Sequence, residues 1–84
     1  MANYQASETR KIAVTTVDKK EHFGTLCTGV ALIADGDCFV AFDENADTGS
    51  YLLKANTPVN FPVQFTELHA ISSGSANLYI LATR

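Results

Sequence analysis

The chain has 84 residues, room for one domain, and its six basic and nine acidic residues give a net charge of −3. Basic residues adjoin only at Arg10-Lys11 and Lys19-Lys20, so the chain lacks the basic stripe that neutralises phosphates, and we expect no nucleic-acid partner. The longest apolar run, Val30 to Ala34, is far shorter than the roughly 20 residues of a membrane-spanning helix, so we expect no membrane segment.

The beginning of the chain predicts an arm followed by a strand. Residues 1–9 are polar and without periodicity, so we expect an N-terminal arm there and a single β-domain over residues 10–84. The domain opens with alternating β-branched residues, with Ile12 and Val14 on one side, which predicts a strand. The charged segment Asp18 to His22 interrupts this alternation and is expected to be a turn.

The middle of the chain predicts a β-hairpin. The run from Leu26 to Ala34 is apolar on both sides, and Gly29 within it disfavours a helix, so we expect a strand covered on both faces. Asp35 to Asp37 has Gly at its centre and reads as a tight turn. Cys38 to Phe42 is then the returning strand of the hairpin.

Shorter strands are expected in the second half, after a polar loop over residues 43–50. Pro62 lies in one of them and cannot donate a hydrogen bond to a neighbour, which places that strand at a sheet edge or at a bulge. About seven short strands with regular turns predict an all-β fold, a small β-sandwich or partly closed barrel of antiparallel strands. The segments in question are Tyr51 to Lys54, Val59 to Phe65, Glu67 to Ile71, and a last strand with Leu78, Ile80 and Ala82 facing inward.

The two cysteines are expected to be reduced and buried. In the predicted hairpin Cys38 lies opposite Ala34, about seven residues from Cys27, which is over ~20 Å along a strand. A disulfide allows only about 7 Å between Cα atoms. Neither cysteine has a histidine or a basic residue beside it in the sequence, so nothing supports a nucleophilic thiol.

The two histidines do not predict a metal site. A zinc site needs three or four ligands at workable spacing, and the sequence offers none. His22 is expected to be solvated in the charged turn. His69 lies in a strand, where a hydrogen-bonded structural histidine is the ordinary interpretation.

The acidic segment 43–49 partly matches a calcium-binding loop. Asp43, Asn45 and Asp47 occupy positions 1, 3 and 5 of an EF-hand, but the glycine comes one position late and Lys54 stands where a bidentate Glu is required. A solvated turn rich in Asp and Asn is therefore favoured over an ion site.

No catalytic constellation is present in the sequence. It contains no nucleophile elbow, no phosphate-binding glycine loop and no dinucleotide-binding turn. We therefore predict that the protein is not an enzyme, and we assign no catalytic, cofactor-binding or metal-binding residues.

The apolar content exceeds what a domain of this size is expected to bury. Apolar residues make up 46% of the chain, with five Phe and three Tyr, whereas such a small domain buries only about 60% of its unfolded surface. The predicted hairpin, Leu26 to Ala34 with Cys38 to Phe42, is therefore the candidate surface for self-association or docking. The alternative is a tightly closed barrel in which small residues such as Ala31 are wall positions. Tyr4 of the arm is a second candidate anchor.

Several segments resemble, in their texture of strands and turns, the small β-rich virion proteins of tailed bacteriophages. The resemblance covers about residues 26–84 and implies a capsid decoration (cement) protein, present in many copies and commonly a dimer or trimer. Its partner would be the major capsid protein or another virion protein, and no individual binding residue carries over. The segments are Asp37 to Phe42, Tyr51 to Val59, His69 to Ile71 and Ala76 to Leu81.

The resemblance also implies a location, the virion, after assembly in the host cytoplasm. The start of the chain agrees, because it has no basic stretch followed by an apolar run and so predicts no signal peptide. Two alternatives stay open: a tail or head–tail structural component, and a carbohydrate-binding β-sandwich module. Such a module would have to use Tyr4, Tyr51 or Tyr79, since the chain has no Trp.

Overall fold

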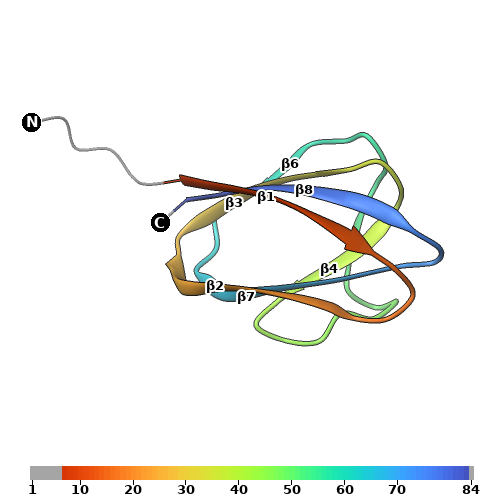
Figure 1. Ribbon diagram of the computed structural model, residues 1–84, viewed down its shortest axis with the longest axis horizontal. Coiled ribbons are helices and arrows are strands. Elements are labelled where there is room, and N and C mark those ends of the chain that lie inside the picture. Colours follow the sequence, from red (N-terminus) through yellow and green to blue (C-terminus); the bar gives the residue numbers. More distant parts are fainter. Residues whose placement is uncertain (1–6, 84) are drawn as a thin grey trace, which may run out of the picture.

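Two four-stranded antiparallel sheets pack face to face in the computed structural model, which describes residues 7–83 (Figure 1). Sheet A has the order β1-β8-β3-β6 and sheet B the order β2-β7-β4-β5. The predicted all-β sandwich is confirmed, and the two sheets do not join into a closed barrel. The strands are β1 (Ser7–Val14), β2 (Lys19–Cys27), β3 (Gly29–Ala34), β4 (Cys38–Phe42), β5 (Tyr51–Leu53), β6 (Val59–Phe61), β7 (Phe65–Ser72) and β8 (Ala76–Thr83).

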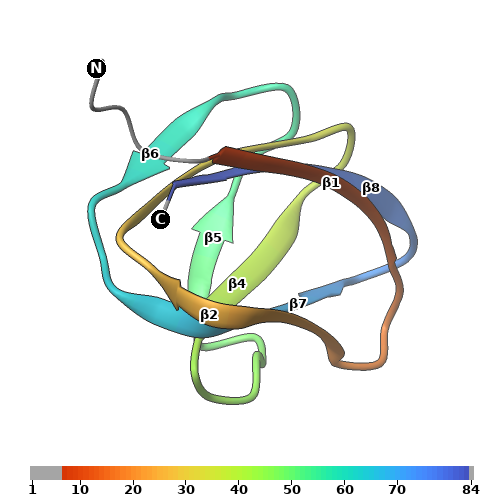
Figure 2. The same cartoon turned by 60° about the vertical axis from the view of Figure 1, so that its left-hand side comes forward.

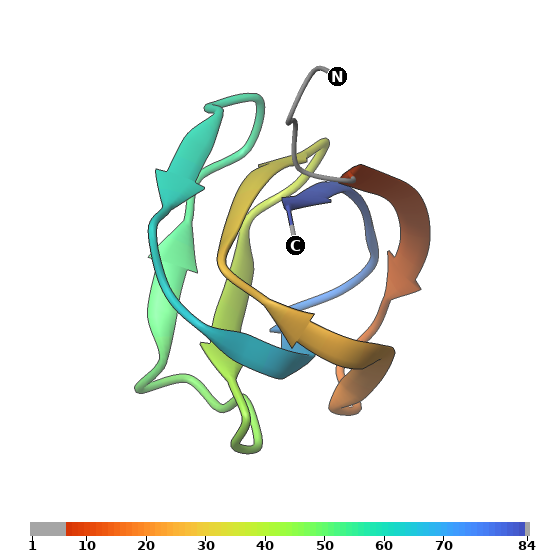
Figure 3. The same cartoon turned by 90° about the vertical axis from the view of Figure 1, so that its left-hand side faces the viewer.

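Most connections cross from one sheet to the other. Only β4 and β5 are both consecutive in the chain and paired with each other, within the described residues. The loop of residues 43–50 joins them and extends beyond the two sheets (Figure 2). Figure 3 shows the short edge strands β5 and β6 on one side of the sandwich and the edge strands β1 and β2 on the other.

Strand β8 shows the alternation on which the core depends. Leu78, Ile80 and Ala82 are buried between the sheets, as predicted, whereas Tyr79 and Leu81 point away from the core. Because successive side chains in a strand point to opposite faces, this pattern fixes which face of sheet A is internal. β1 follows the same rule, with Ile12 and Val14 buried.

An aromatic cluster fills the core between the sheets. Phe65 is fully buried, and its ring centroid lies 5.5 Å from that of Phe23 and 4.9 Å from that of Phe42. Phe42 also meets Phe61, whose ring lies 5.1 Å from Tyr51 and thereby closes the side where β5 and β6 lie. Offset and edge-to-face pairs at these distances add to the stabilisation from burial alone.

Arg10 closes the opposite side of the sandwich. It lies on edge strand β1, and its guanidinium carbon is 4.4 Å from the ring centroid of Phe23 on β2. Its Nη1 donates to Glu21 Oε2 at 2.6 Å, and it also forms an ion pair with Glu8. A stacked guanidinium with two carboxylate partners joins the two sheets at a point where no backbone pairing connects them.

The turn expected at Asp18 to His22 is wrong, because β2 begins at its second residue. The charged side chains of this segment have partners on both sides of the strand. Glu21 pairs with Arg10 of β1, while Lys20 and His22 lie beside Glu67 on the outer face of sheet B. Charge alone therefore does not mark a turn here.

The predicted hairpin is also wrong, because β3 belongs to sheet A and β4 to sheet B. The intervening aspartates bind other parts of the chain. Asp35 accepts hydrogen bonds from the backbone N–H and the side-chain amide of Asn77, which lower its pKa. Asp37 accepts one from the backbone N–H of Ala55 at 2.8 Å. These contacts fix a connection that crosses from sheet A to sheet B, although the local sequence resembles a tight hairpin turn.

Three strand boundaries differ from expectation, and the second of these differences raises the number of strands from about seven to eight. β1 begins at Ser7, so residues 7–9 of the expected arm are part of the sheet; Tyr4 lies outside the described residues. The run Leu26 to Ala34 divides at Thr28 between two sheets. The segment Val59 to Phe65 likewise divides, and its first part, β6, is an edge strand that ends just before Pro62, as the edge prediction required.

Candidate functional site

The outer face of sheet A carries an apolar patch. In the strand register Leu81 lies opposite Ala31, and Tyr79 lies opposite Ile33, so their side chains form two adjacent rows across β8 and β3. The loop before β6 extends the patch. We call it the apolar face; it consists of Ala31, Ile33, Pro58, Tyr79 and Leu81.

The large side chains of the apolar face remain open to solvent. Ile33 is 36% exposed, Tyr79 42% and Leu81 43%. Together they line a shallow groove of about 520 Å³. Antiparallel sheets with one solvated face normally alternate apolar inside and polar outside, so three adjacent large apolar side chains depart from that rule.

The apolar face has very little charge. In its two rows, as far as the structure describes them, Lys11 is the one charged side chain; it lies opposite Tyr79 on β1. The Lys11 Nζ is 5.6 Å from the centroid of the Tyr79 ring. Thr9, opposite Leu81, and Asn60, opposite Ala31, are polar neighbours in the other row. Depletion of charge with an aromatic residue near the centre is typical of the core of a protein–protein interface.

A smaller apolar strip lies on the outer face of sheet B. Phe39 of β4 is opposite Leu52 of β5 on one side and Ile71 of β7 on the other. Leu52 is exposed, and Phe39 and Ile71 are half-buried. The predicted docking surface over β3 and β4 is therefore not one surface: β3 contributes to the apolar face, and β4 contributes to this strip on the other sheet.

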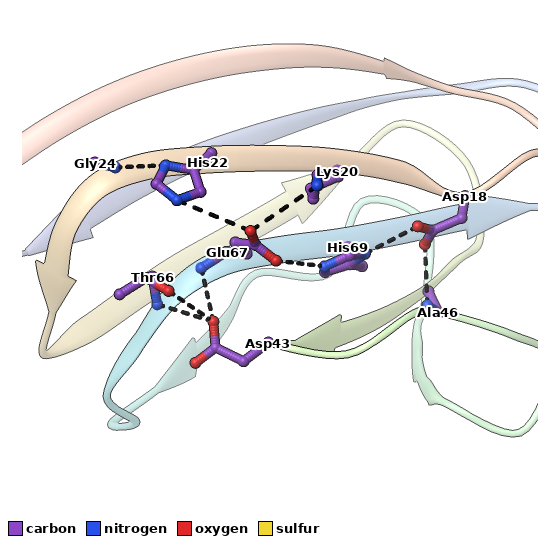
Figure 4. Close-up of polar contacts among 9 residues, drawn as sticks. All are labelled: Asp18, Lys20, His22, Gly24, Asp43, Ala46, Thr66, Glu67 and His69. Atoms are coloured by element: carbon purple, nitrogen blue, oxygen red, sulfur yellow. Dashed lines mark hydrogen bonds and ion pairs between the residues drawn. The ribbon is translucent and has the colours of Figure 1, made fainter.

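A polar network centred on His69 occupies another part of the outer face of sheet B (Figure 4). His69 is on β7 and is only 4% exposed. Its Nδ1 lies 2.9 Å from Oδ2 of Asp18, in the turn between β1 and β2, and its Nε2 lies 3.2 Å from Oε1 of Glu67. The prediction of a hydrogen-bonded structural histidine is confirmed.

The two carboxylates determine the protonation of His69. Burial by itself lowers the pKa of His69, but the hydrogen bonds to Asp18 and Glu67 outweigh it and raise the pKa above its ordinary value. For Asp18, desolvation acts to raise the pKa, and the bonds from His69 and from the backbone of Ala46 prevail and lower it. The network therefore favours an imidazolium between the side chains of Asp18 and Glu67.

The loop 43–50 is bound to this network at two points. Asp18 Oδ1 accepts the backbone N–H of Ala46 at 3.0 Å. At the start of the loop, Asp43 Oδ1 accepts the backbone N–H groups of Thr66 and Glu67 at 3.1 and 2.9 Å, and these bonds lower the pKa of Asp43. Both carboxylates thus bind backbone donors of neighbouring segments.

The acidic residues of segment 43–49 serve separate roles. Asp43 binds β7, whereas Asp47 Oδ1 accepts the backbone N–H of Gly49 within the loop at 2.8 Å. Over residues 7–83 no group of three or more His, Cys, Asp and Glu side chains is arranged to hold a metal ion.

His22 contributes only at the margin of the network. It lies on β2 with its side chain more than half exposed, in agreement with the expected solvation, although in a strand rather than a turn. Its Nδ1 accepts the backbone N–H of Gly24 at 3.0 Å, and its Nε2 lies 3.8 Å from Glu67 Oε2.

The two cysteines are free and buried, as predicted. Cys27 ends β2 and Cys38 begins β4, and each thiol donates to the carbonyl two residues before it. Burial raises the pKa of Cys38, with smaller contributions from Asp35 and Asp37. This environment disfavours the thiolate that a nucleophile requires.

The ring nitrogens of His69 are both occupied by carboxylates, and the ring is buried, which suits a structural role.

No helix within residues 7–83 has the length and apolar character to cross a membrane. Comparisons with protein-family models, curated proteins and solved structures gave no match to this chain.

Proposed function

We propose that this chain is a structural protein of a tailed-bacteriophage virion, a capsid decoration protein that attaches to the major capsid protein through the apolar face. The observation that carries the proposal is the exposure of Ile33, Tyr79 and Leu81 side by side on one sheet. The phage assignment rests on the resemblance of residues 26–84 to small β-rich virion proteins. The apolar face adds a surface suited to protein–protein binding.

The apolar face has the properties of an interface centre. Its side chains are held by the antiparallel pairing of β8 with both β1 and β3, so binding requires little ordering of the backbone. Tyr79 supplies a large, stiff contact area, which is common among residues that dominate binding energy. Lys11 at the margin would favour a carboxylate on the partner.

The mechanism of stabilisation would be mass action. A protein that binds the assembled, expanded shell but not the free subunits stabilises that shell by the binding free energy at each site. Many copies, each binding weakly, would then together resist the pressure of the packaged DNA. This requires no chemical step, and no residue of the chain is assigned one.

Self-association belongs to the same proposal. The apolar face and the strip of Phe39, Leu52 and Ile71 lie on the outer faces of different sheets. One surface can therefore contact the shell while the other contacts a second copy, as expected of a dimer or trimer. Sedimentation velocity tests this part: a monomer at all accessible concentrations would contradict it.

Co-sedimentation with expanded capsids tests the shell contact. Leu81→Lys places a charge in the centre of the apolar face and should reduce binding by about tenfold or more. Val17→Lys is the matched control, because Val17 is 71% exposed in the turn after β1 and lies outside both apolar surfaces. Equal binding by the two variants, or no binding by the unmodified protein, would contradict the proposal.

Sedimentation with tails and binding to a glycan array address the two alternatives. A tail or head–tail component would use the same apolar face but would sediment with tails and not with expanded capsids. For a carbohydrate module, Tyr79 and Tyr51 would have to form a platform, yet Tyr79 is on β8 of sheet A and Tyr51 is on β5 of sheet B against Phe61. Binding to a glycan array that depends on either tyrosine would favour the module.

A further inference from the structure

We propose that His69 is a proton-operated clamp, which as an imidazolium holds the loop 43–50 on the outer face of sheet B and as a neutral ring lets it loosen. The inference concerns a different part of the molecule from the apolar face and does not depend on the proposed function. It rests on the geometry of the network in Figure 4.

The positions of the two carboxylates require two donors on the ring. Asp18 Oδ2 and Glu67 Oε1 lie within 3.2 Å of the two ring nitrogens, and both are acceptors when ionised. Only the imidazolium carries a proton on both nitrogens. In either neutral tautomer one carboxylate faces a nitrogen lone pair, so deprotonation breaks one of the two hydrogen bonds.

The remaining charged groups near the ring do not replace the lost proton. From β2, Lys20 Nζ and His22 Nε2 lie 4.0 and 3.8 Å from Glu67 Oε2, and both side chains are more than half exposed. Asp43, from the end of β4, is bound to the backbone of β7 and adds negative charge near the ring. Glu67 therefore has the cation Lys20 toward which to turn, whereas Lys20 acts on Asp18 only through its charge.

Deprotonation of His69 weakens or removes the hydrogen bond between its ring and Asp18 in either neutral tautomer. If the proton leaves Nδ1, the bond to Asp18 is lost. If it leaves Nε2, the Nδ1–H group still donates to the Asp18 carboxylate, but the attraction between two opposite charges is lost and the bond weakens. Asp18 is the residue that accepts the backbone N–H of Ala46, so this weakening reaches the middle of the loop.

The loop is expected to loosen in its middle while its start stays in place. The bonds from Thr66 and Glu67 to Asp43 do not involve the His69 proton. On both sides of Ala46, the loop also lines a groove of about 460 Å³, together with Tyr51 of β5 and Phe61 of β6. A change in the loop therefore changes the wall of that groove, whose lining includes Glu44, Gly49, Ser50, Tyr51 and Phe61.

Amide hydrogen exchange followed by NMR, with rates normalised to the intrinsic rate at each pH, tests the clamp. Between pH 6 and 9 the protection of the Ala46 amide should fall by about fivefold to tenfold, in step with the titration of the His69 ring. The amide of Thr66, which is held by Asp43, should keep its protection over the same range. This comparison within one protein needs no variant.

Two variants sharpen the test. His69→Gln has no titrating ring, so the protection of the Ala46 amide should be low and independent of pH. His22→Gln is the matched control, since His22 contacts Glu67 only at 3.8 Å, and the Ala46 response should persist. A constant Ala46 protection across the His69 titration, an equal response of Thr66, or loss of the response in His22→Gln would overturn the proposal.

Discussion

The Nδ1 atom of His69 lies 2.9 Å from Oδ2 of Asp18, although 51 positions separate the two residues in the chain. The contact joins β7, the neighbour of both β2 and β4 in sheet B, to the turn that follows the first strand of sheet A. Since Asp18 also binds the backbone of Ala46, one buried histidine connects β7, the turn after β1 and the middle of the loop 43–50.

The stability of the fold should depend on the proton of His69. Because the pKa of His69 is raised in the folded protein, its contribution is complete below the unfolded value, about 6.5, and is lost as pH rises through the folded pKa. Urea denaturation from pH 5.5 to 9 should show the stability difference between the unmodified protein and His69→Gln shrinking as pH rises. A difference that is constant or grows with pH would contradict the assigned charge state, and His22→Gln serves as the control.

The pairing of Arg10 with Glu21 should contribute measurably to stability. Both side chains are only about a quarter exposed, and the guanidinium stacks on Phe23. A double-mutant cycle with Arg10→Met and Glu21→Gln should give a coupling of about 1 kcal/mol. The exposed pair of Lys54 and Asp37, 3.6 Å apart, is the comparison and should give less than about 0.5 kcal/mol. Equal couplings would refute a bridging role for Arg10.

Two glycines should respond to alanine in opposite directions. Gly24 has a φ of 76°, in the left-handed region, so Gly24→Ala should destabilise the fold by about 1–2 kcal/mol. Gly74 lies outside that region and has open space around an added Cβ, so Gly74→Ala should be neutral or stabilise by about 0.5 kcal/mol. Thermal or urea denaturation of the two variants provides the measurement, and a cost at Gly74 equal to that at Gly24 would show that φ is not the cause.

The thiols should be inert in the folded state. Cys27 and Cys38 are fully buried, and burial raises the pKa of Cys38. Reaction with a thiol-specific disulfide reagent should therefore proceed only as fast as the protein opens, and both thiols should react at once in denaturant. Fast modification under native conditions would mean that the core opens near β2 or β4.

Alternation in the sequence was sufficient to predict the class of fold and the inward residues of its most regular strand. Leu78, Ile80 and Ala82 alternate with outward residues over the whole of β8, so the period of two is unambiguous. The hairpin prediction failed because Asp35 to Asp37 has the composition of a tight turn. What distinguishes a turn from a passage between sheets is the contact with Asn77, and that residue is remote in sequence.

Only one of the two contacts of His69 could be predicted from the sequence. Glu67 stands two residues before His69, and residues at that spacing in a strand share a face, so this contact had a local signal. Asp18 had none, because its approach depends on the pairing of β2 with β7. The apolar face was predicted only in part, on the strand that carries Ile33, for the same reason: Ile33 and Tyr79 come together only through the register of β3 and β8.

The order of synthesis bears on how this protein reaches its native state. β8 lies between β1 and β3, so sheet A cannot assemble on the ribosome until residues 76–83 have left the exit tunnel. Until then the emerging chain exposes strands whose pairing partners are missing. Sheet A closes only through contacts between residues that are far apart in the sequence. Folding is therefore expected to be slow for a domain of this size, because sheet A depends on contacts between strands that are far apart in the sequence.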